Sequence, residues 1–385
     1  IDECATDNGG CGEATYYTCT NNVGAVATCA DIPRFLNVPS EYSTIQSALT
    51  AASEGDTVLV QPDTYYENII WPETNGIKLI SAGDSSNTVI DGGGGENVVI
   101  ISVITVIDTT TKIQGFKIIN WSDSGNGLNL NQSNIHISRL NFEGNSQSNG
   151  NCIKIRQANS VIIEHSNMNN ANIGINIVPA SATNNTLIVN NQISNCSTGI
   201  YIDADGNGNL FIGNNIIKSN VTGIWSYKAN PTIYNNIIVN NNLAIWADAG
   251  TCGSGNLCGD VSPTIRKNTI AFNTNYTIID LSNTASLVDS NIFYENTGFQ
   301  LIKTGKFSPT LNQNSLLSIS DYIIVAGENN IDAKNNWWGG MHVDSIGTFI
   351  YDGYDDGTLG FVDISTVLEQ PNTDAPPIPP QNLTV

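Results

Sequence analysis

The chain has little charge for its length. Only 13% of its 385 residues are charged, and 14 Lys and Arg stand against 35 Asp and Glu, which gives a formal net charge of −21. The shortage of cations argues against nucleic acid or anionic lipid as a partner, because both are bound through Lys and Arg. It favours divalent cations as ionic partners. No run of 18 apolar residues is present, so we predict no direct insertion into a membrane.

Helical periodicity is also missing from the centre of the chain. In its place a short phrase, typified by Leu187-Ile-Val-Asn-Asn-Gln-Ile193, recurs between Lys112 and Trp338 about every 23 residues. One longer step contains a Gly- and Cys-rich insert at 251–260. A repeat of this length cannot bury its own apolar face, so the period predicts a solenoid. The second polar position of each phrase supplies a marker: Asn191, Asn215, Asn236, Asn268, Asn291, Asn314 and Asn336.

The composition of each repeat indicates which solenoid it builds. Leucine-rich repeats share the period, but they need a Leu framework and a helical segment. Here the apolar residues are mostly Ile and Val in short alternating runs separated by Asn, Gly and Ser, which predicts two or three short strands per repeat. We therefore predict an all-β fold, a parallel β-helix with Ile and Val stacked inside. Asn at the bends is expected to adopt left-handed backbone angles and to form ladders.

The eight cysteines indicate an oxidising compartment and a secreted or cell-surface protein. Cys4, Cys11, Cys19 and Cys29 crowd into a segment with little apolar material, which predicts a disulfide-stapled cap over 1–35. Three pairings are open, and a zinc site is the alternative. We also predict that Cys252 and Cys258 close the insert. Cys152 and Cys196 are expected to be buried free thiols, because two coils of separation exceed disulfide reach.

The solenoid is predicted to span 36–370 and to be closed at both ends. Ser43 and Gln46 fit a capping box, and Ile45, Ala48, Leu49 and Ala52 form one apolar face, which predicts a short helix over the first coil. The coils are expected to end near Trp338, with 339–370 closing the other end. The Pro-rich tail 371–385 is a candidate for self-association into a fibre, by adding a strand to a neighbouring subunit; the N-terminal cap is another.

Several segments resemble the pectate-lyase-like right-handed parallel β-helix superfamily, and in particular its bacterial secreted and surface branch. They are Val38-Pro-Ser-Glu-Tyr-Ser-Thr-Ile-Gln-Ser-Ala-Leu49, Gly55-Asp-Thr-Val-Leu-Val60, Ile113-Gln-Gly-Phe-Lys-Ile118 and Asn335-Asn-Trp-Trp-Gly339. The resemblance implies a right-handed, single-stranded parallel β-helix. It implies no single activity, because the superfamily holds lyases, hydrolases, epimerases, tailspikes, adhesins and structural modules.

The first residues, Ile1-Asp-Glu-Cys4 and Asn8-Gly-Gly-Cys11, resemble an epidermal-growth-factor-like module with four of its usual six cysteines. In the calcium-binding form, this resemblance implies ligands at Asp2 and Glu3, with Asn21 as a further one.

One column of outward side chains is the main candidate site. Aligning the second strand of successive coils places aromatic residues on three neighbouring strands, flanked by Asp203, Asp205, Tyr227, Lys228 and Asp248. We predict a flat exposed stripe that binds glycan through Tyr201, Trp225, Tyr227 and Trp246. A contact between subunits and simple stacking of neighbouring coils are the alternatives. The column contains Asn129, Lys154, Asn176, Tyr201, Trp225 and Trp246.

Candidate metal ligands follow this stripe. Asp203, Asp205 and Asn207 match the start of a calcium loop, although Asn214 stands where its last Glu would be, and a polar turn is the alternative. Asp352, Asp355 and Asp356 form a second acidic cluster.

The catalytic motifs of the lyases, polygalacturonases and epimerases of the superfamily are absent from the sequence. Asp203, Asp248 and Asp280 are expected to close successive second strands, and they remain an alternative carboxylate set for a glycoside hydrolase or a calcium-dependent polysaccharide lyase. Our prediction is a non-catalytic structural or adhesive module, stabilised by calcium and contacting polysaccharide or sister subunits.

Overall fold

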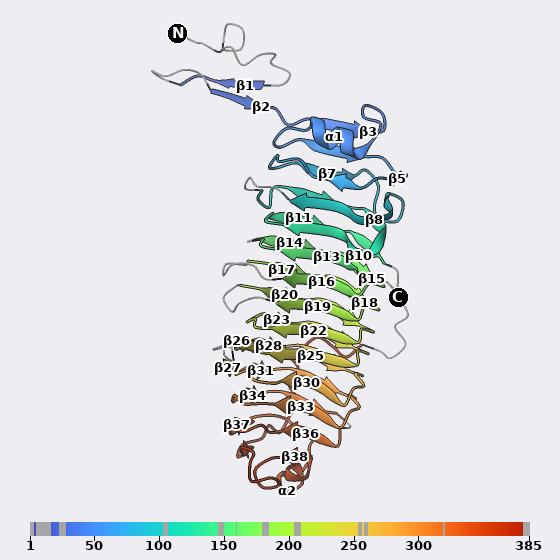
Figure 1. The fold of residues 1–385 in the computed structure, drawn as a ribbon. Coiled ribbons are helices and arrows are strands. Elements are labelled where there is room, and N and C mark those ends of the chain that lie inside the picture. Colours follow the sequence, from blue (N-terminus) through green and yellow to red (C-terminus); the bar gives the residue numbers. More distant parts are fainter. Residues whose placement is uncertain are drawn as a thin grey trace.

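The computed structural model describes residues 4, 17–22, 28–102, 107–144, 150–158, 160–178, 185–203, 209–252, 256–257, 261–318 and 320–379. From Phe35 onward they form one long parallel β-solenoid, with coils stacked along a single axis (Figure 1). Each central coil contributes three strands, so the strands lie in three rows. The predicted all-β parallel β-helix is confirmed.

The first row is a 14-stranded parallel sheet. Its strands are β3 (Phe35–Val38), β4 (Thr57–Val60), β7 (Lys78–Ser81), β9 (Lys112–Gln114), β11 (Ile135–Ser138), β14 (Val161–Glu164), β17 (Leu187–Val189), β20 (Phe211–Gly213), β23 (Thr232–Tyr234), β28 (Thr264–Arg266), β31 (Leu287–Asp289), β34 (Thr310–Asn312), β37 (Ile331–Asp332) and β39 (Val362–Asp363).

The second and third rows are joined through two long strands, β8 (Val89–Ser102) and β10 (Lys117–Asn131), which contribute to both. The second row also holds β5 (Thr64–Tyr66), β12 (Asn141–Glu143), β15 (Asn167–Asn169), β18 (Gln192–Ser194), β21 (Ile216–Lys218), β24 (Ile237–Val239), β29 (Thr269–Ala271), β32 (Ile292–Tyr294) and β35 (Ser315–Leu317). The third row holds β6 (Ile69–Ile70), β13 (Asn151–Arg156), β16 (Ile173–Val178), β19 (Thr198–Asp203), β22 (Thr222–Tyr227), β25 (Leu243–Asp248), β30 (Thr277–Leu281), β33 (Gln300–Thr304), β36 (Tyr322–Val325) and β38 (Ile350–Tyr351).

The core consists of Ile, Val and Leu stacked in register. Ile188, Ile212 and Ile233 occupy equivalent positions on β17, β20 and β23, and all three are fully buried. Side chains alternate between the two faces of a strand, so the neighbours of each core residue point outward. The repeat therefore produces columns of outward side chains as well as columns of core residues.

A row of buried amides runs along the bend between the first and second rows. Asn190, Asn214 and Asn235 adopt the left-handed conformation with φ of 56°. The next residue in each repeat turns its side chain inward, and Asn215 Nδ2 donates to Asn236 Oδ1 at 3.0 Å and to the Ile188 carbonyl at 2.9 Å. This first ladder confirms the role predicted for the marker asparagines, whereas the left-handed angle belongs to the residue before each marker. Its members run from Asn191 through Asn215, Asn236, Asn268, Asn291 and Asn314 to Asn336.

A second ladder, absent from the sequence predictions, follows the bend between the second and third rows. Asn220, Asn241, Asn273 and Asn296 are linked amide to amide at 3.0, 3.2 and 2.9 Å. Cys196 takes the preceding position in this row, where its backbone N–H donates to Asn220 Oδ1. Burial raises the pKa of the Cys196 thiol to about 11.

The cysteine predictions are partly confirmed. Cys152 and Cys196 are free and buried. Cys4 and Cys19 form a disulfide, which favours the disulfide cap over the zinc alternative. Cys29 is also disulfide-bonded and lies within the hairpin of β1 (Tyr17–Thr20) and β2 (Thr28–Asp31). Cys11 and Cys258 lie outside the described residues. The insert contains a small hairpin of β26 (Thr251–Cys252) and β27 (Asn256–Leu257).

Helix α1 (Ile45–Ala51) covers the first coil, as predicted, but its cap differs from the prediction. Thr44, not Ser43, is the N-cap and pairs with Ser47, because the helix begins one residue later than expected. The Glu67 carboxylate accepts from the N–H groups of Ile45 and Gln46 at 2.9 Å. The Gln46 side chain in turn bonds the backbone N–H and carbonyl of Ile70, so it occupies the open edge of β6.

The coils continue past Trp338, contrary to the prediction. After α2 (Val343–Ile346) and a 3-10 turn (Gly347–Phe349), β38 extends the third row and β39 extends the first. No helix in the described ranges is long and apolar enough to cross a membrane.

Candidate functional site

The predicted column of outward side chains exists in the predicted register. Asn129 pairs with Lys154, Lys154 with Asn176, and Asn176 with Tyr201 on successive third-row strands. Tyr201 then pairs with Trp225, and Trp225 with Trp246. The strands β19, β22 and β25 therefore hold the three aromatic side chains in a line along the solenoid axis.

The rings of this column do not form the flat exposed platform that the sequence analysis predicted. Trp225 and Trp246 stack face to face with centroids 4.4 Å apart and planes 8° apart, and Tyr201 meets Trp225 edge-on at 4.9 Å. Neighbouring strands are about 4.8 Å apart, which matches the separation of stacked rings. Each tryptophan therefore covers a face of the other, and the three side chains are only half-exposed.

Polar groups lie beside the column. Tyr227 is in register with Asp203 on one side and Asp248 on the other. The Lys228 ammonium lies 5.0 Å from the centre of the Tyr227 ring. Burial, together with the Asp203 carboxylate, raises the pKa of Tyr201, so its hydroxyl stays protonated and can donate a hydrogen bond.

Asp280 does not lie where the sequence analysis placed it. Its strand partner is Trp246, so it belongs to the aromatic column and not to the column of Asp203 and Asp248. Its carboxylate accepts from the Ser282 N–H at 2.9 Å and lies 3.7 Å from Lys303 Nζ. Asp203 and Asp248 are separated by the intervening coil of Tyr227, which is roughly 10 Å along the axis. Asp280 therefore does not continue the column of Asp203 and Asp248.

A second group of aromatic side chains, absent from the sequence predictions, lies on the same row of strands. Tyr276 and Phe299 stack at 4.8 Å with planes 14° apart. Phe299 meets Tyr322 at 5.3 Å, and Tyr322 meets Tyr351 at 5.4 Å, both edge-on. Tyr276 is 62% exposed. Aligning the residues that precede the last strand of each coil, and not only those within it, would have revealed the first members.

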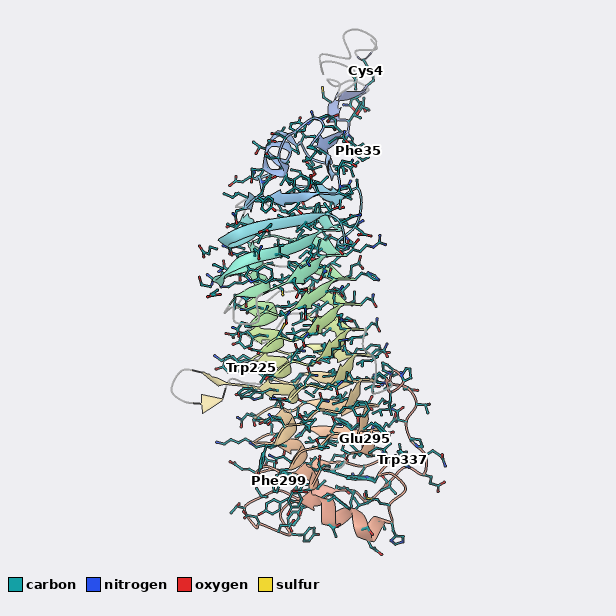
Figure 2. The ribbon with its side chains drawn as sticks, turned by 90° about the vertical axis from the view of Figure 1, so that its right-hand side faces the viewer. Cys4, Phe35, Trp225, Glu295, Phe299 and Trp337 are labelled. Atoms are coloured by element: carbon teal, nitrogen blue, oxygen red, sulfur yellow. A yellow bond between two sulfur atoms is a disulfide. The ribbon has the colours of Figure 1, made fainter. Side chains whose placement is uncertain are left out.

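Both aromatic groups face the same side of the solenoid. Trp225 and Phe299 lie along one flank in Figure 2, whereas Glu295 and Trp337 lie on the opposite flank. We call the eight residues Tyr201, Trp225, Tyr227, Trp246, Tyr276, Phe299, Tyr322 and Tyr351 the aromatic face. It extends over the strands from β19 to β38, six strand spacings of about 4.8 Å or roughly 30 Å.

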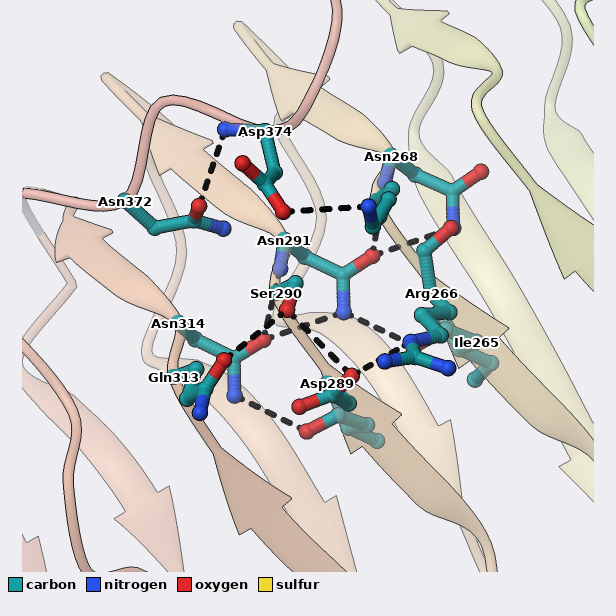
Figure 3. A network of polar contacts seen from close by, with 12 residues as sticks. Ile265, Arg266, Asn268, Asp289, Ser290, Asn291, Gln313, Asn314, Asn372 and Asp374 are labelled. Carbon is teal, nitrogen blue, oxygen red and sulfur yellow. Dashed lines mark hydrogen bonds and ion pairs between the residues drawn. The ribbon is translucent and has the colours of Figure 1, made fainter.

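The second row, on another flank, is covered in part by the chain's own tail. Lys267 Nζ lies 3.0 Å from Asp374 Oδ2, and this hydrogen-bonded carboxylate raises the pKa of Lys267. The Asn372 N–H donates to the Ser315 hydroxyl at 2.7 Å, and the Thr269 hydroxyl donates to the Pro376 carbonyl. Figure 3 shows the tail residues Asn372 and Asp374 beside the first ladder, at Asn268, Asn291 and Asn314. The described part of the tail, to Pro379, thus binds its own solenoid.

The predicted metal ligands are not assembled in the described ranges. Asp205, Asn207, Asp2 and Glu3 lie outside them, so calcium at those positions stays a prediction. Asp352 does not share a site with Asp355 and Asp356; its two oxygens accept backbone N–H groups from Tyr354 and Val362. Across the described residues, no three His, Cys, Asp or Glu side chains are placed to hold a metal ion.

Comparisons with known proteins agree with this architecture. The family model for the right-handed β-helix region matches residues 126–258. Among curated protein sequences, no significant match is found. The right-handed parallel β-helix fold that the resemblance implied is confirmed.

Several solved structures share this fold. The mannuronan C-5 epimerase AlgE6 A-module of Azotobacter vinelandii is 14% identical, with a TM-score of 0.52 over 87% of this chain and 95% of that chain. The catalytic unit of a GH87 α-1,3-glucanase from Streptomyces thermodiastaticus is 12% identical, with a TM-score of 0.53 over 84% and 66%. DFA-IIIase from Arthrobacter chlorophenolicus is 9% identical, with a TM-score of 0.53 over 86% and 98%. At these identities the similarity concerns the fold alone.

Proposed function

For this right-handed parallel β-helix, we propose the role of a non-catalytic extracellular structural or adhesive module that binds an extended neutral polysaccharide along its aromatic face. The observation that carries the proposal is the presence of eight aromatic side chains, in two groups, over roughly 30 Å of one flank. A soluble protein rarely leaves such a surface uncovered without a partner. Sugar rings pack on aromatic rings, and the flanking carboxylates accept hydrogen bonds from sugar hydroxyls.

The negative charge of the molecule indicates whether a neutral or an acidic polysaccharide fits this flank. A net charge of −21 repels acidic chains at a distance. Beside the aromatic column, Asp203 and Asp248 add local negative charge, and Lys303 lies against Asp280. A neutral polysaccharide therefore fits this flank better than an acidic one.

The two aromatic groups would contribute differently. Trp225 and Trp246 offer ring edges, because each covers a face of the other. Tyr276 stacks on Phe299 and keeps 62% of its surface exposed, so its ring is the most accessible stacking platform of this face. The stack fixes the position of Tyr276, which reduces the entropy lost when a sugar binds.

The disulfide between Cys4 and Cys19 supports the extracellular location, since such bonds persist in oxidising compartments. Asp280 lies in a different column from Asp203 and Asp248, which argues against the predicted carboxylate set and supports a binding role over hydrolysis or elimination. The proteins that share the fold include enzymes, but a shared fold does not transfer an activity.

An array of immobilised neutral and acidic polysaccharides tests the proposal. We expect the wild type to bind neutral glycans, Tyr276→Ala to weaken binding about tenfold, and Tyr276→Phe to bind almost as well as the wild type. Tyr66→Ala, at an isolated ring that is 77% exposed on the second row, is the matched control. Absence of binding, or equal binding by Tyr276→Ala, would contradict the proposal. In that case electron microscopy of filaments would test the alternative, contact between subunits.

A further inference from the structure

A groove of about 630 Å³ lies on the first row of strands near the C-terminal end. Its floor is formed by β34, β37 and β39, with Thr310, Asp332 and Asp363 among its lining residues. Tyr354 and Phe361 form one wall. The groove belongs to a different row from the aromatic face, so its function does not depend on the function proposed above.

The wall is carried by a loop that a buried carboxylate holds in shape. Asp352 is only 4% exposed. Its Oδ1 accepts from the Tyr354 N–H and its Oδ2 from the Val362 N–H, each at 2.9 Å. The Gly353 N–H donates to the Gly360 carbonyl at 3.0 Å and closes the loop between these ends. The acidic residue that the sequence suggested as a metal ligand thus fixes the backbone from which Tyr354 projects.

The Tyr354 side chain has little packing function of its own. It is 88% exposed and meets Phe361 edge-on, with centroids 4.9 Å apart. The Phe361 N–H is held by Asn330 Oδ1 at 2.8 Å. A large aromatic side chain on a rigid loop, turned to solvent at the rim of a groove, is costly to expose and is typical of a binding surface. Unlike Trp225, this ring is not stacked face to face.

The groove floor supplies polar groups at regular spacing. Thr310, Asp332 and Asp363 are in register on three successive strands, about 4.8 Å apart. Lys334 Nζ lies 3.0 Å from Asp363 and 3.8 Å from Asp332, so part of the negative charge is neutralised. Both carboxylates remain about half exposed and can accept further hydrogen bonds. Such a floor suits hydroxyl groups better than a free cation.

We propose that this groove is a saccharide-binding site, in which a neutral pyranose ring packs on Tyr354 and its hydroxyls bond to Asp332, Asp363 and Thr310. It is separate from the aromatic face and would give the module two points of attachment to a carbohydrate surface. Two linked contacts raise the overall avidity far above that of either alone.

The first test follows the ring itself. The full chain is labelled with 3-fluorotyrosine, the fluorine resonance of residue 354 is assigned by its loss in Tyr354→Phe, and soluble β-1,4-glucan, α-1,4-glucan and β-1,4-mannan hexasaccharides are titrated in turn. We expect at least one to shift this resonance in a saturable way. If no hexasaccharide moves it, the proposal is overturned. A shift of the Tyr354 resonance without a shift of the Tyr276 resonance would support this site and contradict the aromatic-face proposal. A shift of the Tyr276 resonance alone would support the aromatic face and contradict this site.

The second test uses calorimetry on variants whose fold is not at risk, since Tyr354 makes so few contacts. Tyr354→Ala should weaken binding of the responsive hexasaccharide at this site at least tenfold. Tyr354→Phe should bind within about threefold of the wild type, because it keeps the ring, and Asp332→Asn should give an intermediate loss. Unchanged binding by Tyr354→Ala would overturn the proposal. The Tyr276→Ala variant is the control, because any binding heat that it loses comes from the aromatic face.

Discussion

Two kinds of side-chain row run along the solenoid axis, and the same repeat produces both. The first ladder is inside: Asn215, Asn236 and Asn268 are buried, and each amide is bonded to the next and to a backbone carbonyl. The aromatic face is outside: Trp225 and Trp246 stack on each other but remain half-exposed, and Tyr276 is largely uncovered. Repetition in a solenoid is therefore no sign of function by itself. Surface that stays exposed after all contacts within the chain are made is the better sign.

The ladder should respond most strongly to mutation. Asn236→Ala removes the acceptor of the Asn215 N–H and Nδ2, which lie 2.9 and 3.0 Å from Asn236 Oδ1. Each buried group left without a partner costs about 1–3 kcal/mol, so the free energy of unfolding, measured by urea denaturation, should fall by about 2–6 kcal/mol. Asn242→Ala, at an exposed asparagine of the same coil, is the control and should be almost neutral. An equal loss in both variants would mean that the buried ladder contributes no more to stability than an exposed asparagine does.

The aromatic stack should show the opposite pattern. Trp246→Ala removes a stacked pair that contributes about 0.5–1.5 kcal/mol beyond its buried area. Because the ring is partly exposed and no buried amide loses its partner, we expect a smaller loss in urea denaturation than for Asn236→Ala. Trp246→Ala should weaken glycan binding about tenfold, which is more than we expect from Asn236→Ala. Trp246→Phe keeps a ring against Trp225 and should recover most of both. If Trp246→Ala lowered stability by as much as the ladder variant and left binding unchanged, the stack would be structural only.

The sequence predicted the interior well because the interior repeats. The alternation of Ile and Val and the recurrence of Asn191, Asn215 and Asn236 were sufficient for the coil, the core and the first ladder. The second ladder was missed because its row begins with Cys196 and contains fewer matching phrases. The capping box was misplaced by one residue because Ser43 and Thr44 are both good N-cap residues.

The exterior was predicted less well because contacts between neighbouring side chains decide it. Register alone placed Tyr201, Trp225 and Trp246 in one column, yet only their ring planes show that the stripe is not flat. Asp280 was assigned to the wrong column because a strand of five residues, β30, replaces strands of six. The tail's contacts with Lys267 and Ser315 join residues far apart in sequence, and no local pattern encodes them.

The tail-covered flank should give a smaller effect than either row. Truncation after Gln370 removes the contacts to Ser315, Lys267 and Thr269. All three contacts hold the tail at the solenoid surface, and none supports the core. We therefore expect the melting temperature in calorimetry to fall by only about 2 °C. In a large domain, this shift corresponds to a loss of about 1 kcal/mol or less in the free energy of unfolding. Ser315→Ala should reproduce part of this fall. A loss as large as that of Asn236→Ala would show that the tail is an integral part of the fold.

The smallest effect concerns the charge of Asp363 in the C-terminal groove. The pKa of this carboxyl is lowered from its usual value of 3.8 to about 2. The main cause is the hydrogen bond from the backbone N–H of Ser365, and the next is the hydrogen bond from the Lys334 ammonium. A depressed folded-state pKa means that the favourable contribution is complete above pH 4 and is lost only as the pH falls through about 2. We therefore expect carbon NMR of the Asp363 carboxyl to show no titration between pH 7 and pH 4.

Lys334→Ala sharpens this prediction. It removes the ammonium but keeps the Ser365 hydrogen bonds, so the pKa of Asp363 should rise only part of the way to 3.8. The same variant should leave the fluorine resonance of Tyr354 in place, because the loop is held by Asp352 and not by Lys334. A full return of the pKa to 3.8 would mean that the ion pair, and not the backbone, sets the charge of the groove, and its saccharide binding would then depend strongly on salt.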